Sequence, residues 1–331
     1  MSGPRIVAVN EPRVGLRAVI VIRSSARGPA FGGVRRCAYP NEHAGLADAE
    51  RLAEAMSQKC ALAGLAAGGA KAVIFDDPAL QREAGYARLG QAIEQLGGEV
   101  VCGPDIGTGA AELAILRRAT RWVSPAQNDP TRSTAAGVMA GLRGLSRVVF
   151  DDEALGDRRY VIQGLGAVGS ALAAALLGAG AQVSGWDPDP IARARAAEIG
   201  VKLLDEARLM REPCEVFMPC ALGQVLTRER CEQGPWAAVC GAANNQLAEP
   251  EAGLILHRRG VPWAPDFVVN SGAVIEGVET MLGPEYGARA RVVARIEAIA
   301  ERCAMILERA RSQDRGSQTV ALELAQAALI D

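Results

Sequence analysis

Two lysines set among small and apolar residues are the side chains of this sequence best suited to chemistry. The run Leu46–Cys60 has the spacing of a helix with one apolar stripe, and Lys59 continues that stripe. Lys71 ends the run Ala61–Lys71, and all the residues of this run before Lys71 are uncharged. Because a buried ammonium is costly unless it is paired or its pKa falls, the two lysines predict a site that binds an anion and uses a base. The alternative for either lysine alone is a stem on apolar surface with its charge in water.

The elements around these lysines predict a mixed α/β arrangement in the first part of the chain. Short apolar runs typical of strands flank longer segments with helical spacing. Asp105 follows one such run at its carboxyl end, where α/β proteins often place functional acids. The polar stretch Ser124–Arg132 contains prolines and is typical of a hinge. The predicted strands are Ile6–Val9, Ala18–Ile22, Ala72–Phe75 and Val100–Cys102, and the predicted helices are Leu46–Cys60 and Tyr86–Leu96.

Beyond that stretch, short apolar runs alternate with helical segments, which predicts a parallel sheet with helices on both faces. A helix is expected from Ala135 to about Val149. The segment Ala288–Ala328 has a mostly helical, amphipathic pattern. The predicted strands lie near Tyr160–Gln163, Gln182–Trp186, Glu215–Met218, Ala237–Cys240 and Phe267–Val269.

A glycine-rich turn between a predicted strand and a predicted helix has the pattern of a dinucleotide-binding site. The turn reads Gly164-Leu165-Gly166-Ala167-Val168-Gly169. The first glycine allows a tight turn, the second lets the backbone approach a pyrophosphate, and the third lets helix and strand pack closely. Asp187 lies about 20 residues further on, where a carboxylate binds the ribose hydroxyls and repels a 2′-phosphate, so NAD is favoured over NADP. The alternative is a glycine-rich turn without a nucleotide.

The composition excludes several classes of function. A net charge of −2 gives no electrostatic case for nucleic acid or for an anionic membrane, and no apolar run is long enough to span a bilayer. The eight cysteines are scattered without a CxxC pair, and there are only two histidines, so we expect no metal site. Reduced thiols and an N-terminal segment without a signal-peptide pattern favour a cytoplasmic protein.

Eight segments, in order along the chain, resemble the Glu/Leu/Phe/Val amino-acid dehydrogenases, and the leucine, valine and phenylalanine enzymes more than the glutamate enzymes. The resemblance runs from about Gly15 to Glu279. The segments are PAFGGVRR (Pro29–Arg36), MSQK (Met56–Lys59), AGLAAGGAK (Ala63–Lys71), PDIGT (Pro104–Thr108), GLGAVG (Gly164–Gly169), PCALG (Pro219–Gly223), GAANNQL (Gly241–Leu247) and APDFVVNSGAVI (Ala264–Ile275).

The resemblance implies a role for each matching residue. Lys59 would bind the substrate carboxylate, Lys71 would be the general base, and Asp105 would exchange protons with the amino group. Gly32, Gly33 and Asn270 would contact the substrate, and Asn244, Thr134, Cys220 and Ala221 would contact the cofactor. Taken alone, Asp105 and Asn244 could be turn residues, Asn270 a strand-end cap, and Cys220 a residue that only packs.

The resemblance also implies an α/β fold of two domains, and 331 residues suit two cores rather than one. We predict a mixed α/β substrate and oligomerisation domain over residues 1–130 and a Rossmann-type NAD-binding domain over residues 131–300. Helices from about residue 300 to residue 331 are expected to pack back on the first domain. The family further implies a homo-oligomer.

The expected reaction is NAD-dependent deamination of an apolar L-amino acid to its 2-oxo acid and ammonia, and the reverse amination. No charged residue in the matching segments is placed to receive a side-chain carboxylate, which argues against glutamate. Branched-chain substrates are favoured, followed by aromatic ones. The alternatives are a specialised biosynthetic member acting on an aromatic or other carboxylate-bearing amine, and a catalytically silent NAD-binding protein.

Overall fold

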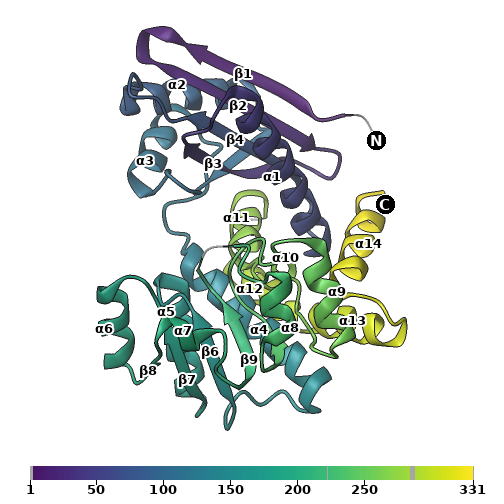
Figure 1. Cartoon of the computed structure of the whole chain (residues 1–331). Helices are drawn as coiled ribbons and strands as arrows, with labels where there is room; N and C mark the ends of the chain where they lie inside the picture. The colour runs from purple at the N-terminus through teal and green to yellow at the C-terminus, as the bar shows by residue number, and fades with distance from the viewer. Residues whose placement is uncertain (1–2, 222, 284–287, 331) are drawn as a thin grey trace. The chain divides into compact units, whose positions relative to one another are not determined.

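The computed structural model describes residues 3–221, 223–283 and 288–330 and separates into two compact units (Figure 1). Two hydrogen bonds join distant segments within the first unit. Asn128 donates its side-chain amide to Thr280 Oγ1 at 2.9 Å, and Arg27 donates to the carbonyl of Ala328. The first unit contains Met1–Asn128, Val274–Arg289 and Ala325–Asp331, and the second contains Asp129–Ala273 and Ala290–Leu324.

The sheet of the first unit is mixed, with the strand order β1-β2-β4-β3-β5. β2 pairs antiparallel with β1 and β4, whereas β3 is parallel to both of its neighbours. All eight residues of β4 are buried, so this strand lies at the centre of the unit. The strands are β1 (Arg5–Glu11), β2 (Leu16–Ser24), β3 (Ala30–Cys37), β4 (Gly68–Phe75) and β5 (Val100–Gly103).

The helices of the first unit pack against this sheet through small residues. Asn41 begins α1 (Glu42–Leu62) by accepting a hydrogen bond from Ala44 N at 2.9 Å. A Cβ atom on Gly69 of β4 would lie 2.2 Å from the backbone nitrogen of Ser57 in α1, so only glycine permits this approach. The other elements of this part of the chain are the 3₁₀ helix η1 (Pro12–Val14), α2 (Arg82–Gln95) and α3 (Ala110–Ala119).

The sheet of the second unit is entirely parallel, with the strand order β10-β9-β6-β7-β8. Strands and helices alternate along this part of the chain, which confirms the predicted parallel sheet. Asp129 begins α4 (Pro130–Phe150) by accepting a hydrogen bond from Arg132 N at 3.0 Å. The strands are β6 (Arg159–Gln163), β7 (Gln182–Trp186), β8 (Lys202–Leu203), β9 (Cys214–Pro219) and β10 (Trp236–Val239).

The remaining helices follow the strands of this sheet or form the C-terminal part of the chain. The C-terminal segment is helical, as its amphipathic pattern predicts. The helices are α5 (Ala167–Gly178), α6 (Pro190–Glu198), α7 (Glu206–Leu209), α8 (Arg228–Gln233), α9 (Pro250–Arg258), α10 (Asp266–Val269), α11 (Gly272–Leu282), α12 (Ala288–Glu297), α13 (Ile299–Ser312) and α14 (Ser317–Ile330).

Two local expectations differ from the structure. The strand predicted at Phe267–Val269 is wrong, because these residues belong to the short helix α10. Pro265 precedes that helix and Asp266 is its first residue, and a short apolar run has no period that could tell helix from strand. β3 was not among the predicted strands because Gly32 and Gly33 interrupt its apolar pattern.

Candidate active site

Lys71 and Asp105 form a buried ion pair in the first unit. Lys71 lies in the central strand β4 and is 5 % exposed. Asp105 lies in the turn after β5, at the carboxyl end of that strand, and its Oδ2 atom is 2.6 Å from Lys71 Nζ. The turn is closed by a hydrogen bond from Thr108 N to the Asp105 carbonyl at 2.9 Å. Non-local strand pairing therefore brings together two residues that were separate candidates in the sequence.

The surroundings change the protonation equilibria of both members of this pair. Burial lowers the pKa of Lys71 below its ordinary value, and the nearby positive charge of Arg35 acts in the same direction, whereas Asp105 opposes the shift. Burial alone would raise the pKa of Asp105, but the charge of Lys71 and a hydrogen bond from Arg35 lower it below its ordinary value. The pair therefore favours a carboxylate beside an amine that loses its proton readily.

Gly32 and Gly33 of β3 lie against this pair, and each has a different reason to be glycine. A Cβ atom on Gly33 would lie 2.7 Å from the Pro104 carbonyl oxygen and 3.2 Å from Lys71 Nζ. A Cβ atom on Gly32 would lie 1.9 Å from the carbonyl oxygen of Ala70 in β4. Gly33 therefore leaves space at the reactive groups, and Gly32 permits the close pairing of β3 with β4.

Lys59 lies in the last turn of α1 and is half-buried. A cation in this position is stabilised by the partial negative charge of a helix C-terminus. Arg35, which was not among the predicted site residues, contacts Asp105 from β3 through a hydrogen bond of 2.8 Å from Nε to Oδ2. The two-residue period of a strand places Arg35 on the same face as Gly33, and this signal could have identified it.

The glycine-rich turn of the second unit has the form that the sequence predicted. Gly164 has a φ of +96°, which favours glycine. A Cβ atom on Gly169 would lie 1.9 Å from the Gly164 carbonyl oxygen, whereas one on Gly166 would meet nothing within 4 Å. Gly166 is the N-cap of α5, and Ala167 and Val168 are the first residues of that helix. The open space at Gly166 beside a helix N-terminus fits a pyrophosphate group.

Asp187 follows β7 and is turned toward this glycine-rich turn. Its carboxylate accepts hydrogen bonds from Leu165 N at 2.7 Å and from Asp189 N at 2.8 Å. A cavity of about 340 Å³ lies next to this position in the second unit. It is lined by Trp186, Arg193, Leu203, Leu204, Asp205 and Glu206. The carboxylate and the cavity fit the ribose and adenine end of a dinucleotide.

The other predicted cofactor residues fall into two groups within the second unit. Ala221 lies against the glycine-rich turn, because a Cβ atom on Gly164 would be 2.6 Å from the Ala221 Cβ atom. Cys220 follows β9 and donates its backbone N–H to the Gln163 carbonyl at 2.7 Å, and burial raises the pKa of its thiol to about 12. A thiol of this kind is a packing residue rather than a nucleophile. Half-buried Thr134 lies in α4.

Asn270 and Asn244 are in direct contact. Asn270 is 5 % exposed and donates its side-chain amide to Asn244 Oδ1 at 3.0 Å and to the Ala242 carbonyl at 3.1 Å. Its own Oδ1 atom is buried and accepts no hydrogen bond from any described residue. A buried amide oxygen without a donor is costly, so a ligand that brings an N–H or O–H group here would satisfy it.

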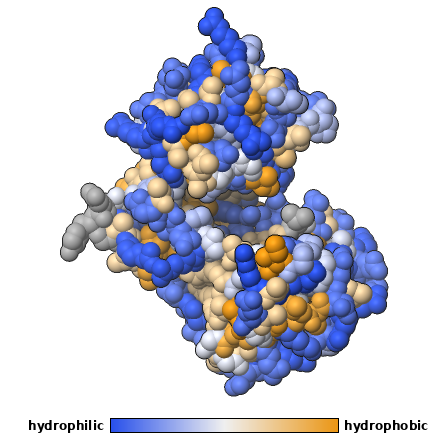
Figure 2. Space-filling view, turned by 90° about the vertical axis from the view of Figure 1, so that its left-hand side faces the viewer, coloured by the Kyte–Doolittle hydropathy of each residue, from blue (hydrophilic) through white to orange (hydrophobic). Residues whose placement is uncertain are grey.

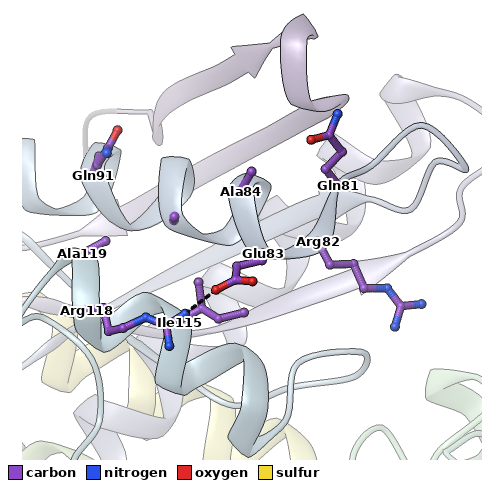
Figure 3. Close-up of a pocket in the computed structure, with 9 residues that line it drawn as sticks. Gln81, Arg82, Glu83, Ala84, Gln91, Ile115, Arg118 and Ala119 are labelled. Atoms are coloured by element: carbon purple, nitrogen blue, oxygen red, sulfur yellow. Dashed lines mark hydrogen bonds and ion pairs between the residues drawn. The ribbon is translucent and has the colours of Figure 1, made fainter.

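A larger cavity, of about 670 Å³, lies between α2 and α3 and contains none of the predicted site residues (Figure 3). The ion pair between Arg118 and Glu83, at 2.8 Å, joins its two sides. Both side chains are largely exposed, so this interaction contributes little. The cavity is lined by Gln81, Arg82, Glu83, Ala84, Ala87, Gln91, Ile115, Arg118 and Ala119. We assign it no role in the chemistry.

Within the part of the chain that the structure describes, no group of histidine, cysteine, aspartate and glutamate side chains could hold a metal ion. All eight cysteines are free thiols. No described helix is long and apolar enough to cross a membrane. The face shown in Figure 2 is largely hydrophilic, with small hydrophobic patches among polar residues.

Two protein-family models match the chain. Residues 5–122 match the Glu/Leu/Phe/Val dehydrogenase dimerisation domain, and residues 191–329 match the Glutamate/Leucine/Phenylalanine/Valine dehydrogenase domain. Phenylalanine dehydrogenase from Caldalkalibacillus thermarum is 34% identical over 308 residues, covering 89% of this chain and 82% of that protein. Leucine dehydrogenase from Thermoactinomyces intermedius is 33% identical over 330 residues, covering 97% of this chain and 89% of that protein.

A solved structure agrees with these matches over almost the whole length. The crystal structure of L-tryptophan dehydrogenase from Nostoc punctiforme has a TM-score of 0.86 and 27% sequence identity, and the match covers 98% of this chain and 95% of that one. The resemblance and the two-domain α/β fold class predicted from the sequence are thereby confirmed. The chain belongs to the Glu/Leu/Phe/Val dehydrogenase family and is an NAD(P)-using amino-acid dehydrogenase, an oxidoreductase that acts on CH–NH2 donors.

Proposed function

We propose that this enzyme interconverts an apolar L-amino acid with its 2-oxo acid and ammonia and uses NAD. The observation that carries the proposal is the buried pair of Lys71 Nζ and Asp105 Oδ2, 2.6 Å apart. Oxidative deamination needs a base for water and a group that exchanges protons with nitrogen, and this pair supplies both. A protein that only bound the dinucleotide would have no use for so deeply buried a lysine.

In this proposal Lys59 binds the α-carboxylate of the substrate. Lysine is a compact point charge, and Lys59 is only half-buried, so its ammonium group can bind an anion. The backbone at Gly32 and Gly33 lines the space beside the reacting carbon, and Gly33 has no side chain that would fill this space. Asn270 contacts the substrate through its otherwise unsatisfied Oδ1 atom.

The chemistry then depends on proton transfers at two atoms. Bound NAD⁺ supplies the acceptor for the hydride that leaves the substrate Cα. Neutral Lys71 takes a proton from the water that attacks the iminium carbon, and Asp105 exchanges protons with the nitrogen as it leaves as ammonia. The amino acid, water and NAD⁺ thus give the 2-oxo acid, ammonium, NADH and one proton. Burial and Arg35 assist the base, because both lower the pKa of Lys71.

The proposal of NAD rather than NADP is supported by Asp187. Its carboxylate lies at the end of β7 against the glycine-rich turn, where it can accept hydrogen bonds from the ribose hydroxyls. A 2′-phosphate in the same place would be repelled by this charge. Arg193, which lines the neighbouring cavity, donates through Nη1 to the backbone carbonyl of Asp187 at 2.5 Å.

Replacement of Asp187 by serine is expected to raise the KM for NAD about tenfold, because a hydrogen bond to a charged group is lost. The ratio of kcat/KM for NADP to that for NAD should rise by more, because the repulsion is removed as well. Steady-state kinetics with both cofactors measure the two effects. Asp189→Ser is the matched control, since serine retains the cap of α6 that Asp189 provides. An unchanged preference in Asp187→Ser would mean that the ribose is recognised elsewhere.

We place branched-chain side chains first among the substrates and aromatic ones second. The similar proteins are named for phenylalanine and leucine, and the similar solved structure is named for tryptophan. A specialised biosynthetic enzyme for an aromatic substrate is the second candidate, and its aromatic substrate is supported by the match to a structure named for tryptophan. Both candidates keep Lys59, so both require a substrate with a carboxylate.

NADH formation is expected with at least one of L-leucine, L-valine, L-isoleucine, L-phenylalanine and L-tryptophan and not with L-glutamate. The absorbance of NADH reports turnover directly. For each amino acid, the corresponding amine without the carboxylate is a matched control that should not be a substrate. Preferred turnover of L-glutamate would contradict the apolar class. If none of the amino acids gave NADH although the protein still bound NAD, the proposed activity itself would be contradicted.

We also propose a homo-oligomer in the cytoplasm. The match of residues 5–122 to a dimerisation domain supports the oligomer. The free state of all eight cysteines agrees with a reducing compartment.

A further inference from the structure

The guanidinium of Arg35 lies between two carboxylates of the first unit. Its Nε atom donates to Asp105 Oδ2 at 2.8 Å, and its Nη1 atom donates to Asp48 Oδ2 at 2.9 Å. The exposed fraction of the Arg35 side chain is 16% and that of Asp48 is 17%. Ion pairs this sheltered are more strongly coupled than surface pairs, and arginine can hold two carboxylates in fixed directions.

Asp48 is itself fixed from several sides. It lies in α1, and its Oδ2 atom accepts a second hydrogen bond from the Tyr39 hydroxyl at 2.8 Å. Its Oδ1 atom accepts one from Arg51 at 2.6 Å. Burial alone would raise the pKa of Asp48, but these donors and the charge of Arg35 lower it. Asp48 therefore remains ionised and anchors the far end of Arg35.

The two donors to Asp105 share one oxygen. Arg35 Nε and Lys71 Nζ both reach Oδ2, whereas Oδ1 receives no hydrogen bond from the residues that the structure describes. Arginine does not lose its proton in proteins, so Arg35 remains a donor to Oδ2 whatever the protonation state of Lys71. Oδ1 is left as the oxygen that can accept or donate a proton.

We propose that Arg35 and Asp48 are positioning residues of the reaction, which hold Asp105 by Oδ2 so that its proton exchange with the substrate nitrogen uses Oδ1. The proposal deepens the proposed function and rests on it. Arg35 also places a permanent positive charge near Lys71, and Asp48 partly balances that charge. Neither residue needs to touch the substrate to have these effects.

The two charges should shift the pKa of Lys71 in opposite directions. Arg35→Gln removes a cation and frees Asp105 to pair with Lys71 alone, so the pKa of Lys71 should rise. Asp48→Asn removes an anion while an amide oxygen still accepts from Arg35, so the pKa of Lys71 should fall by a smaller amount. Arg35→Lys restores the positive charge but not the guanidinium that donates to both Asp105 and Asp48, so the pKa of Lys71 should return toward its original value.

The experiment is an NMR titration of protein labelled with [ε-¹³C]lysine, combined with the pH profile of kcat/KM. The chain has only three lysines, Lys59, Lys71 and Lys202, and Lys71→Met assigns the relevant resonance. Arg35→Lys adds a fourth resonance, which is identified by its absence from the spectrum of the unaltered protein. Asp77→Asn is the matched control, because Asp77 pairs with Arg17 in the same unit. The acid limb of the profile should shift with the NMR pKa, and kcat should fall at least about tenfold in Arg35→Gln with an unchanged KM for NAD.

Each outcome decides the proposal. Opposite shifts in Arg35→Gln and Asp48→Asn, with no shift in Asp77→Asn, would support it. An active enzyme whose Lys71 resonance and pH profile are unmoved by either substitution, with only a lower Tm, would show that the ion pairs are structural and would overturn it. If Arg35→Gln does not fold, Asp48→Asn and Arg35→Lys decide. An unaltered enzyme that turns over no amino acid would instead overturn the proposed function, and this proposal with it.

Discussion

Replacement of Lys71 by methionine is expected to lower kcat for deamination by about a thousandfold or more while NAD binding persists. Methionine has nearly the shape of the lysine stem, so the buried strand β4 should remain packed. The variant lacks the amine that takes a proton from water. Its glycine-rich turn, in the other unit, is unaltered. Stopped-flow or steady-state absorbance measures turnover, and isothermal calorimetry measures NAD binding.

The role of a base is separated from that of a cation by Lys71→Arg. Arginine keeps the charge and cannot lose its proton, so this variant should be as inactive as Lys71→Met. Burial lowers the pKa of Lys71, so the rate of the unaltered enzyme should rise with pH as the amine loses its proton, with a midpoint below the ordinary lysine pKa of 10.5. Lys202→Met is the control, because that side chain is 65% exposed. Substantial deamination by Lys71→Arg would remove Lys71 from the role of base.

Replacement of Gly33 by alanine is expected to lower kcat by about a hundredfold, because a methyl group would intrude between the reacting groups. The new Cβ atom would lie 2.8 Å from the Asp105 Cβ atom and 3.2 Å from Lys71 Nζ, so one of the two must move. The pair would then lose the 2.6 Å contact between the lysine and the carboxylate. The KM for NAD should not change, because the glycine-rich turn lies in the other unit.

The neighbouring glycine should behave differently. An alanine at Gly32 would place its Cβ atom 1.9 Å from a backbone oxygen of β4, so the pairing of two central strands must open. We expect Gly32→Ala to lower the free energy of unfolding by about 3 kcal/mol or more. Gly178→Ala is the control for both variants, since a Cβ atom there meets nothing within 4 Å. Urea unfolding gives the stability of all three variants, and steady-state kinetics give their kcat. A Gly33→Ala variant with lower stability but unchanged kcat would contradict the proposed role of Gly33.

The motifs that lie within one short segment could be predicted from the sequence. The glycine-rich turn is an example, because strand, turn and helix are consecutive and each glycine has a local reason for its place. Lys59 could be singled out because it continues the apolar stripe of its helix, and Lys71 because the rest of Ala61–Lys71 is uncharged. The use of lysine is itself informative, since the chain has three lysines among 36 lysine and arginine residues. A residue that must lose its proton cannot be arginine.

Contacts between distant strands could not be predicted in this way. The pairing of β3 with both β4 and β5 brings Arg35, Lys71 and Asp105 together, and no local pattern specifies that strand order. Arg35 and Asp48 have the appearance of surface charges in the sequence, and only the fold buries them against each other. The helix α10 shows the converse limit, because its apolar run fits a strand equally well.

The discontinuity of the first unit affects the order in which the enzyme can fold during synthesis. Domains generally fold as they emerge from the ribosome, beginning with the N-terminal one. Here the first unit includes Val274–Arg289 and the segment from Ala325 onward, and Arg27 is hydrogen-bonded to the carbonyl of Ala328. The sheet that holds Lys71 and Asp105 emerges early, but the segment that supplies Ala328 to the same unit emerges much later. Translation through Ala328 is therefore a condition for the contact that joins these two distant segments of the unit.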